Sequence, residues 1–170
     1  MNEKAPIHAW SDLPAGMQVP RLRPLFLIRL QVAPAVSVGN TPTGTRRVAV
    51  VEGGTFEGEI DGLSGSVHAG GNDWLTERAD GSLHLDARIV LQAGNGDLVM
   101  MEYAGIRHGA PEIMRKVAAG EDVPPEEYYF RIAPRFETAS KSLDWVNRVV
   151  AVGIGQRLRD GVRYSVFELA

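Results

Sequence analysis

The amino-acid sequence predicts an all-β fold, mainly antiparallel, that closes into a small barrel or sandwich. Glycine and proline are abundant, with 19 Gly and 10 Pro in 170 residues, as expected of a chain built from strands and tight turns. Apolar segments bounded by turn residues recur along the chain, and a single segment carries the signals of a helix. These patterns together predict about nine strands and one short helix.

The chain begins with a segment of neither helical nor strand periodicity. We therefore expect an N-terminal arm over residues 1–20 and one domain over residues 21–170. Strand character begins at Leu25, in the run LFLIRLQV, and ends before Pro34. The next predicted strand, RRVAVVEGGTFEGEI, contains the pair Gly53-Gly54, which is typical of a bulge or a close backbone approach.

The middle of the chain predicts a three-stranded antiparallel meander. Ala79-Asp80-Gly81 separates the strand that starts at Trp74 from SLHLDARIVLQ, and Gly94-Asn95-Gly96 leads on to DLVMMEYAGIR. The helix follows over PEIMRKVAAG, with Pro111 in the first turn and Gly120 at the end. EYYFRIAP, WVNRVVAVGIG and GVRYSVFEL then predict the last three strands.

The distribution of apolar residues predicts closure and self-association. SLHLDARIVLQ alternates simply, whereas DLVMMEYAG and the strand expected over residues 145–154 are apolar on both faces. An antiparallel sheet that is apolar on both faces needs a cover on each side. A barrel interior provides one cover. The helix, the arm or a second subunit must provide the other, so we expect a homo-oligomer.

Composition excludes several classes of function. The absence of cysteine rules out disulfides, thiolate zinc sites, iron–sulfur clusters and a cysteine nucleophile. No apolar run is long enough for a membrane span and no signal peptide is evident, so we expect a cytoplasmic protein with no membrane partner. A net charge of -3 without a basic stripe argues against nucleic acid. Histidine spacing and the lack of a phosphate-binding loop predict no metal and no cofactor.

Six short motifs follow one another in an order that resembles a known family. They are GGTFEG, GGNDW, LDAR, GIRHG, YYFRIAPRFET and WVNR, within residues 25–169. The set resembles the UPF0311 family of bacteria and fungi, also called DUF3237, with two departures, Ile132 in place of Thr and Val146 in place of Leu. The resemblance implies a compact, lipocalin-like antiparallel barrel that assembles into oligomers. It implies no particular activity.

The dipeptide Asp73-Trp74 is the first candidate site. It follows Gly70-Gly71, a pair free to adopt unusual backbone angles. Asp73 could act as a catalytic base or orienting group at a pocket mouth, with Trp74 stacking on a planar ligand. Alternatively, the aspartate caps a turn and the indole belongs to the core.

Asp86 and Arg88 share one strand face and could together hold a polar ligand group. We assign Asp86 to catalysis and Arg88 to substrate binding if their face is turned inward, since a barrel that encloses a ligand can have polar inner positions. Simple alternation along this strand also fits a solvated outer face.

The last candidates lie in the two final motifs. Arg131 could bind an enolate or carboxylate oxygen, Glu137 could be a general base, and Tyr129 could contact the substrate. Trp145 and Asn147 suit recognition of a ring that bears a carbonyl group. The alternative is structural, with Arg131 in an ion pair and the amide bonded to a bulge.

These residues favour a small-molecule-binding barrel that works as a cofactor-independent acid–base enzyme. An isomerase, lyase or cyclase acting on a small cyclic or aromatic carbonyl metabolite needs only a dry pocket, a carboxylate of shifted pKa and an oxyanion partner. A non-catalytic carrier or sensor of an apolar metabolite is the first alternative. A structural oligomerisation module is the second.

Overall fold

The structure is a computed structural model that describes residues 9–60 and 62–170. Residues 1–8 of the expected arm lie outside the described residues. The strands are β1 (Leu22–Val32), β2 (Val36–Thr41), β3 (Gly44–Glu57), β4 (Gly65–Val67), β5 (Gly71–Glu77), β6 (Leu83–Ala93), β7 (Leu98–Gly109), β8 (Tyr128–Thr138), β9 (Ala151–Leu158) and β10 (Gly161–Leu169).

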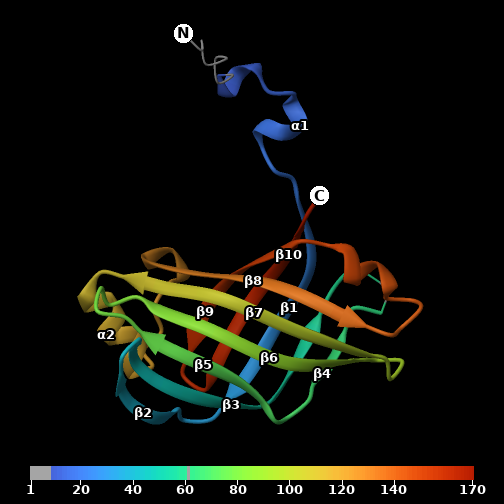
Figure 1. Cartoon of the computed structure of the whole chain (residues 1–170). Helices are drawn as coiled ribbons and strands as arrows, with labels where there is room; N and C mark the ends of the chain where they lie inside the picture. The colour runs from blue at the N-terminus through green and yellow to red at the C-terminus, as the bar shows by residue number, and fades with distance from the viewer. Residues whose placement is uncertain (1–8, 61) are drawn as a thin grey trace.

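The strands form one antiparallel sheet that closes on itself. Its order is β1-β10-β9-β8-β7-β6-β4-β3-β2, with β5 between β3 and β6. β1 pairs with both β10 and β3, and this double pairing closes the barrel (Figure 1). The predicted all-β barrel is thereby confirmed. There are ten strands rather than about nine, because β2 and the short β4 were not predicted.

Gly53 and Gly54 produce the irregularity expected in the second strand. The register of β1 against β3 shifts beside this pair, and both glycines have positive φ. A Cβ on Gly54 would collide with the backbone carbonyl of Arg29 on β1. The pair therefore lets two backbones approach closely where β3 bends from one pairing partner to another.

The two halves of the interior differ in chemistry. Phe26 packs edge-on against Phe56 and Phe136, with ring centroids 5.6 and 5.9 Å apart. Leu91 and Val99 complete this apolar half, and both are buried. The other half contains ionisable and phenolic side chains, so one end of the barrel is an ordinary packed core and the other is not.

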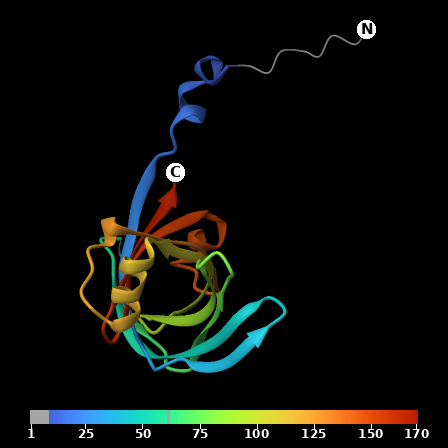
Figure 2. The same cartoon turned by 90° about the vertical axis from the view of Figure 1, so that its left-hand side faces the viewer.

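The predicted helix is α2 (Pro111–Ala119), and Gly120 ends it with φ 76° in the left-handed region. Its Val117 is buried in the core. Figure 2, a view toward one end of the barrel, shows α2 standing at that end. The helix therefore neighbours the polar half of the interior, where β7 ends and β8 begins.

The strand expected over residues 145–154 is wrong in its first half. Asp144–Arg148 form a short 3-10 helix, η3, and β9 begins at Ala151. Val146 of η3 is buried and belongs to the apolar core. The apolar residues of this segment thus cover the Phe-rich end of the barrel. An apolar run in the sequence does not show whether the segment is such a cover or a strand.

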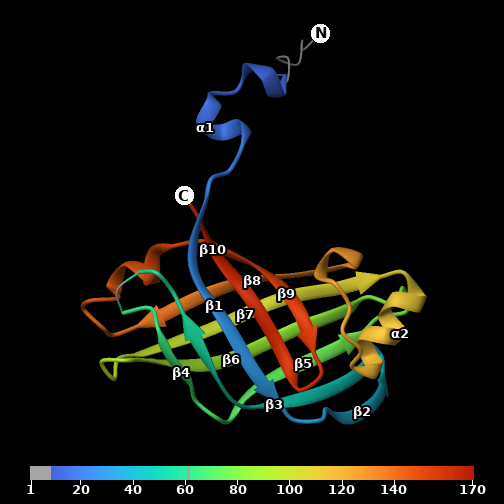
Figure 3. The same ribbon diagram turned by 180° about the vertical axis from the view of Figure 1, so that it is seen from behind.

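Two short helical segments lie outside the barrel on the chain that leads to β1. They are η1 (Trp10–Asp12) and α1 (Ala15–Gln18), and Figures 1 and 3 show them projecting away from the sheet. Within residues 9–60 and 62–170, no helix combines the length and apolar character needed to cross a membrane.

Candidate functional site

Asp73 faces the interior of the barrel. On β5 it lies opposite Ala49 of β3 and Ala87 of β6. These two alanines are 4% and 0% exposed, so the face that Asp73 shares with them is the inner one. The small alanine side chains leave the carboxylate between them.

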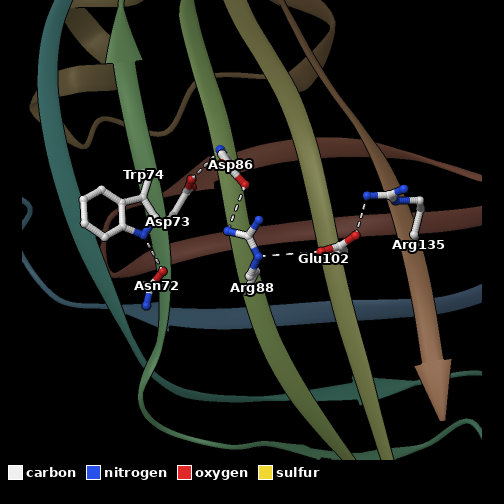
Figure 4. Close-up of polar contacts among 7 residues, drawn as sticks. All are labelled: Asn72, Asp73, Trp74, Asp86, Arg88, Glu102 and Arg135. Carbon is white, nitrogen blue, oxygen red and sulfur yellow. Dashed lines mark hydrogen bonds and ion pairs between the residues drawn. The ribbon is translucent and has the colours of Figure 1, made fainter.

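The environment of Asp73 changes its acidity. Burial raises the pKa of this carboxyl from 3.8 to about 7, outweighing the backbone N–H of Asp86 and the charge of Arg107, which lower it. The Asp86 N–H donates to Asp73 Oδ1 at 3.3 Å (Figure 4). A carboxyl with this pKa exchanges protons readily at neutral pH.

Two tyrosines lie within the same interior. Tyr103 of β7 and Tyr164 of β10 meet edge-to-face, with ring centroids 5.5 Å apart, and Phe130 packs on Tyr164 at 5.3 Å. Burial raises the pKa of both tyrosines, and the nearby Asp73 charge raises each further. Both phenols therefore stay protonated and can act as hydrogen-bond donors.

No hydrogen bond of ordinary geometry reaches the Tyr164 hydroxyl among the residues that the structure describes, although the Tyr103 phenol lies near enough to affect its pKa. Tyr164 is 1% exposed. A buried polar group without a partner costs about 1–3 kcal/mol, so such groups often mark places where a ligand binds. Gly155 makes room for this ring, since a Cβ there would lie 2.7 Å from the Phe130 ring and 2.8 Å from the Tyr164 ring.

Three inward-facing arginines surround the polar end of the barrel. We call them the arginine rim: Arg47 of β3, Arg107 of β7 and Arg157 of β9. Arg107 lies opposite the buried Leu83 and Phe130, which fixes its inward direction. Burial lowers the pKa of Arg107, and the charges of Arg157 and Arg47 lower it further. The three cations are thus close enough to act on one another.

Asp86 and Arg88 face outward. Both side chains are exposed and belong to a surface chain of ion pairs, in which Arg88 contacts Asp86 at 3.5 Å and Glu102 at 3.6 Å (Figure 4). Glu102 continues the chain to Arg135. The alternation of β6 explains this direction, because Leu85, Ala87 and Ile89 fill the interior. Asp86 meets Asp73 through its backbone rather than its carboxylate.

Trp74 also lies on the outer face. Its ring is 42% exposed, and its Nε1–H donates to the Asn72 side chain at 2.7 Å (Figure 4). As the neighbour of Asp73 on a strand, it must point to the opposite side of the sheet. The structure therefore separates the two members of the dipeptide that the sequence presented together.

Tyr129, Arg131 and Glu137 lie on the outer face of β8. The Tyr129 ring is 43% exposed, stacks on His108 at 4.9 Å and lies under the Arg131 guanidinium at 4.9 Å. Arg131 also donates to the backbone of Phe130. Glu137 is exposed opposite Met100. None of these three side chains shares the interior with Asp73.

Trp145 and Asn147 belong to η3 at the other end of the barrel. Asn147 bonds the backbone N–H and carbonyl of Thr138 at 2.8 and 3.1 Å, as the structural alternative expected of an amide. Trp145 packs against the core and lies under Arg23 at 5.1 Å. Both hold η3 to the sheet.

The sequence analysis did not select Tyr103, Arg107, Arg157 or Tyr164. A signal for the first two was available, because Tyr103 and Arg107 stand an even number of residues from Val99 and Met101 and so share their face. Apolar residues on both faces of β7 hid which face was inner. Knowing which face of β7 lines the interior requires the strand register. In the structure Tyr103 pairs with Ala87, an inner residue of β6.

Two surface grooves lie away from Asp73. A groove of about 440 Å³ runs over β1, β3, β9 and β10, and another of about 690 Å³ lies between α2 and the β5–β6 hairpin. Asp73 borders neither groove. Within the described part of the chain, no cluster of three or more His, Asp or Glu side chains is arranged to hold a metal ion.

Comparisons with known proteins agree on one family. The family model "Protein of unknown function (DUF3237)" matches residues 20–169. A UPF0311 protein of Rhodopseudomonas palustris is 34% identical over 145 residues, 85% of this chain and 94% of that protein. Its crystal structure, described as a conserved protein of unknown function, has a TM-score of 0.85 and covers 89% of this chain and 99% of that one.

Two further solved structures have the same fold. A β-barrel-like protein from Acinetobacter baumannii has a TM-score of 0.77 at 36% identity, covering 89% of this chain and 97% of that one. The crystal structure of an enzyme from Penicillium herquei has a TM-score of 0.66 at 21% identity, covering 89% of this chain and 95% of that one.

Proposed function

This chain belongs to the DUF3237 family, and from that premise we propose that it is a cofactor-independent acid–base enzyme whose reaction takes place inside the barrel. The substrate is a small cyclic or aromatic carbonyl compound, and the reaction is an isomerisation, elimination or cyclisation. The observation that carries the proposal is Asp73, an inward-facing, half-buried carboxyl whose pKa is about 7. Such a carboxyl can take a proton and return it at physiological pH.

The residues have complementary roles in such a reaction. Asp73 removes a proton from a carbon next to the carbonyl group, and the electron pair of the broken C–H bond moves toward the carbonyl oxygen. Tyr103 and Tyr164 remain protonated and donate hydrogen bonds to the oxygen that becomes negative. Asp73 then returns the proton to a second atom, which completes an isomerisation without any net change in protons.

The fold provides the setting for this chemistry. Partial burial on the inner face removes water from part of the Asp73 carboxylate, and exclusion of water strengthens electrostatic contacts. The Penicillium herquei protein shows that this fold serves an enzyme.

Hydrogen–deuterium exchange tests the proposal without knowledge of the natural substrate. Cyclic ketones such as 2-tetralone are incubated with the protein in D₂O, and loss of the proton next to the carbonyl is followed by NMR. We expect the protein to accelerate exchange and Asp73→Asn to lose about 10²–10⁴-fold of that acceleration. The rate should rise with pH through about 7, because the ionised carboxylate is the base.

Asp160→Asn is the matched control. Asp160 is an exposed carboxylate that pairs with Arg29 at 2.9 Å, so its removal should leave exchange unchanged. An Asp73→Asn variant that retains the full rate would contradict the proposal. Ketones that bind the protein and exchange at the uncatalysed rate would contradict it as well and favour a carrier.

A further inference from the structure

The arginine rim has more positive charge than the described carboxylates neutralise. Arg47 pairs with Glu77 at 3.0 Å. Arg157 donates to the backbone carbonyl of Gly161. Among residues 9–60 and 62–170, no carboxylate lies within 4.0 Å of Arg107 or Arg157. The three arginines are half-buried, and cations partly removed from water are normally paired, so this arrangement needs an explanation.

Of the three rim arginines, Arg47 and Arg157 each contact a protein oxygen atom, of Glu77 and of Gly161. Arg107 has the weakest polar contacts of the three within the described residues. It is half-buried on the inner face of β7, and its guanidinium lies 5.4 Å from the Phe130 ring centroid. A flat guanidinium that rests on an aromatic ring keeps its N–H groups free to bind a carboxylate or other oxyanion side by side. The geometry is therefore that of a binding group rather than of a structural ion pair.

Unpartnered polar atoms extend inward from the rim. The Arg47 Nε is buried without a hydrogen-bond partner in the described structure, and so is the Tyr164 hydroxyl. Tyr164 is fully buried, and its ring packs at 5.3 Å on the same Phe130 ring that Arg107 covers at 5.4 Å, which places the two groups in one neighbourhood. Unsatisfied donors thus lie at the rim and below it, in line with a ligand that carries oxygen atoms at two places.

We propose that the barrel takes a small planar organic anion, whose negatively charged oxygen atoms bind the arginine rim and whose ring reaches inward to Asp73 and Tyr164. The inference builds on the proposed function, since it names the charge class of the substrate for the same interior. It accounts for an anion-binding rim around a carboxyl that is only about half-ionised at pH 7. A base that was fully ionised would repel such a substrate.

Benzoate and benzamide form a matched pair of probes, because they have the same ring and nearly the same size but differ in charge. Binding to the full-length protein is followed at pH 7 by ¹⁵N NMR titration. We expect benzoate to bind about tenfold or more tightly than benzamide, with shift changes at Arg107, Arg157 and Tyr164. Equal affinities, or shift changes confined to the outer face, would overturn the proposal.

Arginine variants assign the effect to the rim. Arg107→Gln should remove most of the preference for benzoate. Arg135→Gln should leave it unchanged, because Arg135 is an exposed arginine in an ion pair with Glu102 on the outer surface. A preference that survives Arg107→Gln, or disappears in Arg135→Gln, would contradict the assignment.

The Asp73→Asn variant separates this inference from the proposed function. At pH 8 the variant lacks the negative charge that Asp73 carries in the wild type, so benzoate should bind it more tightly. Unchanged or weaker benzoate binding would contradict the placement of the ring beside Asp73. Binding is measured here without turnover. Loss of proton exchange therefore speaks only to catalysis, and loss of the benzoate preference speaks only to the anion site.

Discussion

Asp73 is the residue on which the account depends, and its burial has a cost that can be measured. Its pKa is about 7 in the folded protein and near 3.8 in an unfolded chain. Between these pH values the folded state binds more protons than the unfolded state, so the free energy of unfolding falls as pH rises from about 4 to 7. The stability that protonated Asp73 contributes at low pH is therefore lost once the pH has passed 7.

We predict that Asp73→Asn is more stable than the wild type at pH 8 by about 2–4 kcal/mol, since one pKa unit corresponds to about 1.4 kcal/mol. At pH 4 the difference should largely disappear. Urea unfolding at the two pH values measures both quantities. A variant that is less stable than the wild type at pH 8 would show that the carboxylate has a structural partner.

Tyr164 and Tyr128 form a second residue-scale comparison. The Tyr164 hydroxyl has no partner in the described structure, whereas the Tyr128 hydroxyl accepts the backbone N–H of Arg157 at 2.8 Å. Tyr164→Phe should be neutral or stabilising, and Tyr128→Phe should cost about 1 kcal/mol. Urea denaturation of the two variants measures this contrast, and equal losses would contradict the unpartnered state of Tyr164.

Of the nine candidate residues predicted from the sequence, only Asp73 lies on the inner face of the barrel. Asp73 was predicted because the pair Gly70-Gly71 precedes it, and β5 begins at Gly71. Asp86 and Arg131 were selected for their chemistry, which does not reveal the direction of a side chain. Arg107 was not selected because its partners, Leu83 and Phe130, come from distant parts of the chain.

At the scale of strands, small residues on the inner face determine where large rings fit. Gly155 of β9 lies against Phe130 and Tyr164. We predict that Gly155→Ala destabilises the protein by about 1–3 kcal/mol, as expected when a methyl group enters a packed core. Thermal or urea unfolding measures the loss.

Gly94→Ala is the control for this substitution. Its added Cβ would meet Ser64 O at 3.8 Å, an ordinary van der Waals distance. The control should remain within about 0.5 kcal/mol of the wild type. Similar losses in both variants would show that contact with the Phe130 and Tyr164 rings does not decide the effect.

The accuracy of the element predictions follows the strength of local signals. The meander from β5 to β7 was predicted because turn residues separate its apolar segments, and Gly96 has the positive φ such a turn requires. The segment 144–148 was predicted as strand because Trp145 and Val146 are apolar. Its helical turn depends on contact with the barrel end, where Asn147 bonds Thr138, and a local pattern carries no information on such contacts.

At the scale of the whole molecule, the pairing between β8 and β9 is a short seam in the barrel. β8 and β9 are aligned at Arg131 with Ile154 and at Ile132 with Gly153, whereas β7 and β8 pair from Val99 to Gly109. We predict faster amide hydrogen exchange in β9 than in β7, because fewer ladder bonds must open. Slower exchange in β9 would contradict a seam at this position.

Self-association stays a prediction. It was expected because two predicted strands are apolar on both faces. Exposed apolar side chains lie on the outer surface, among them Leu27, Val36, Val38, Val90 and Val150. The mass of the protein in solution, measured by light scattering, tests it.

Direct titration of Asp73 tests the central claim. The side-chain carboxyl ¹³C resonances of the aspartates are followed by NMR from pH 3 to 9, and Asp73→Asn assigns the signal of interest. The account predicts a titration with its midpoint near 7, well apart from that of the exposed Asp160. A midpoint near 4 would place Asp73 in water or in an ion pair and would contradict its role as a base inside the barrel.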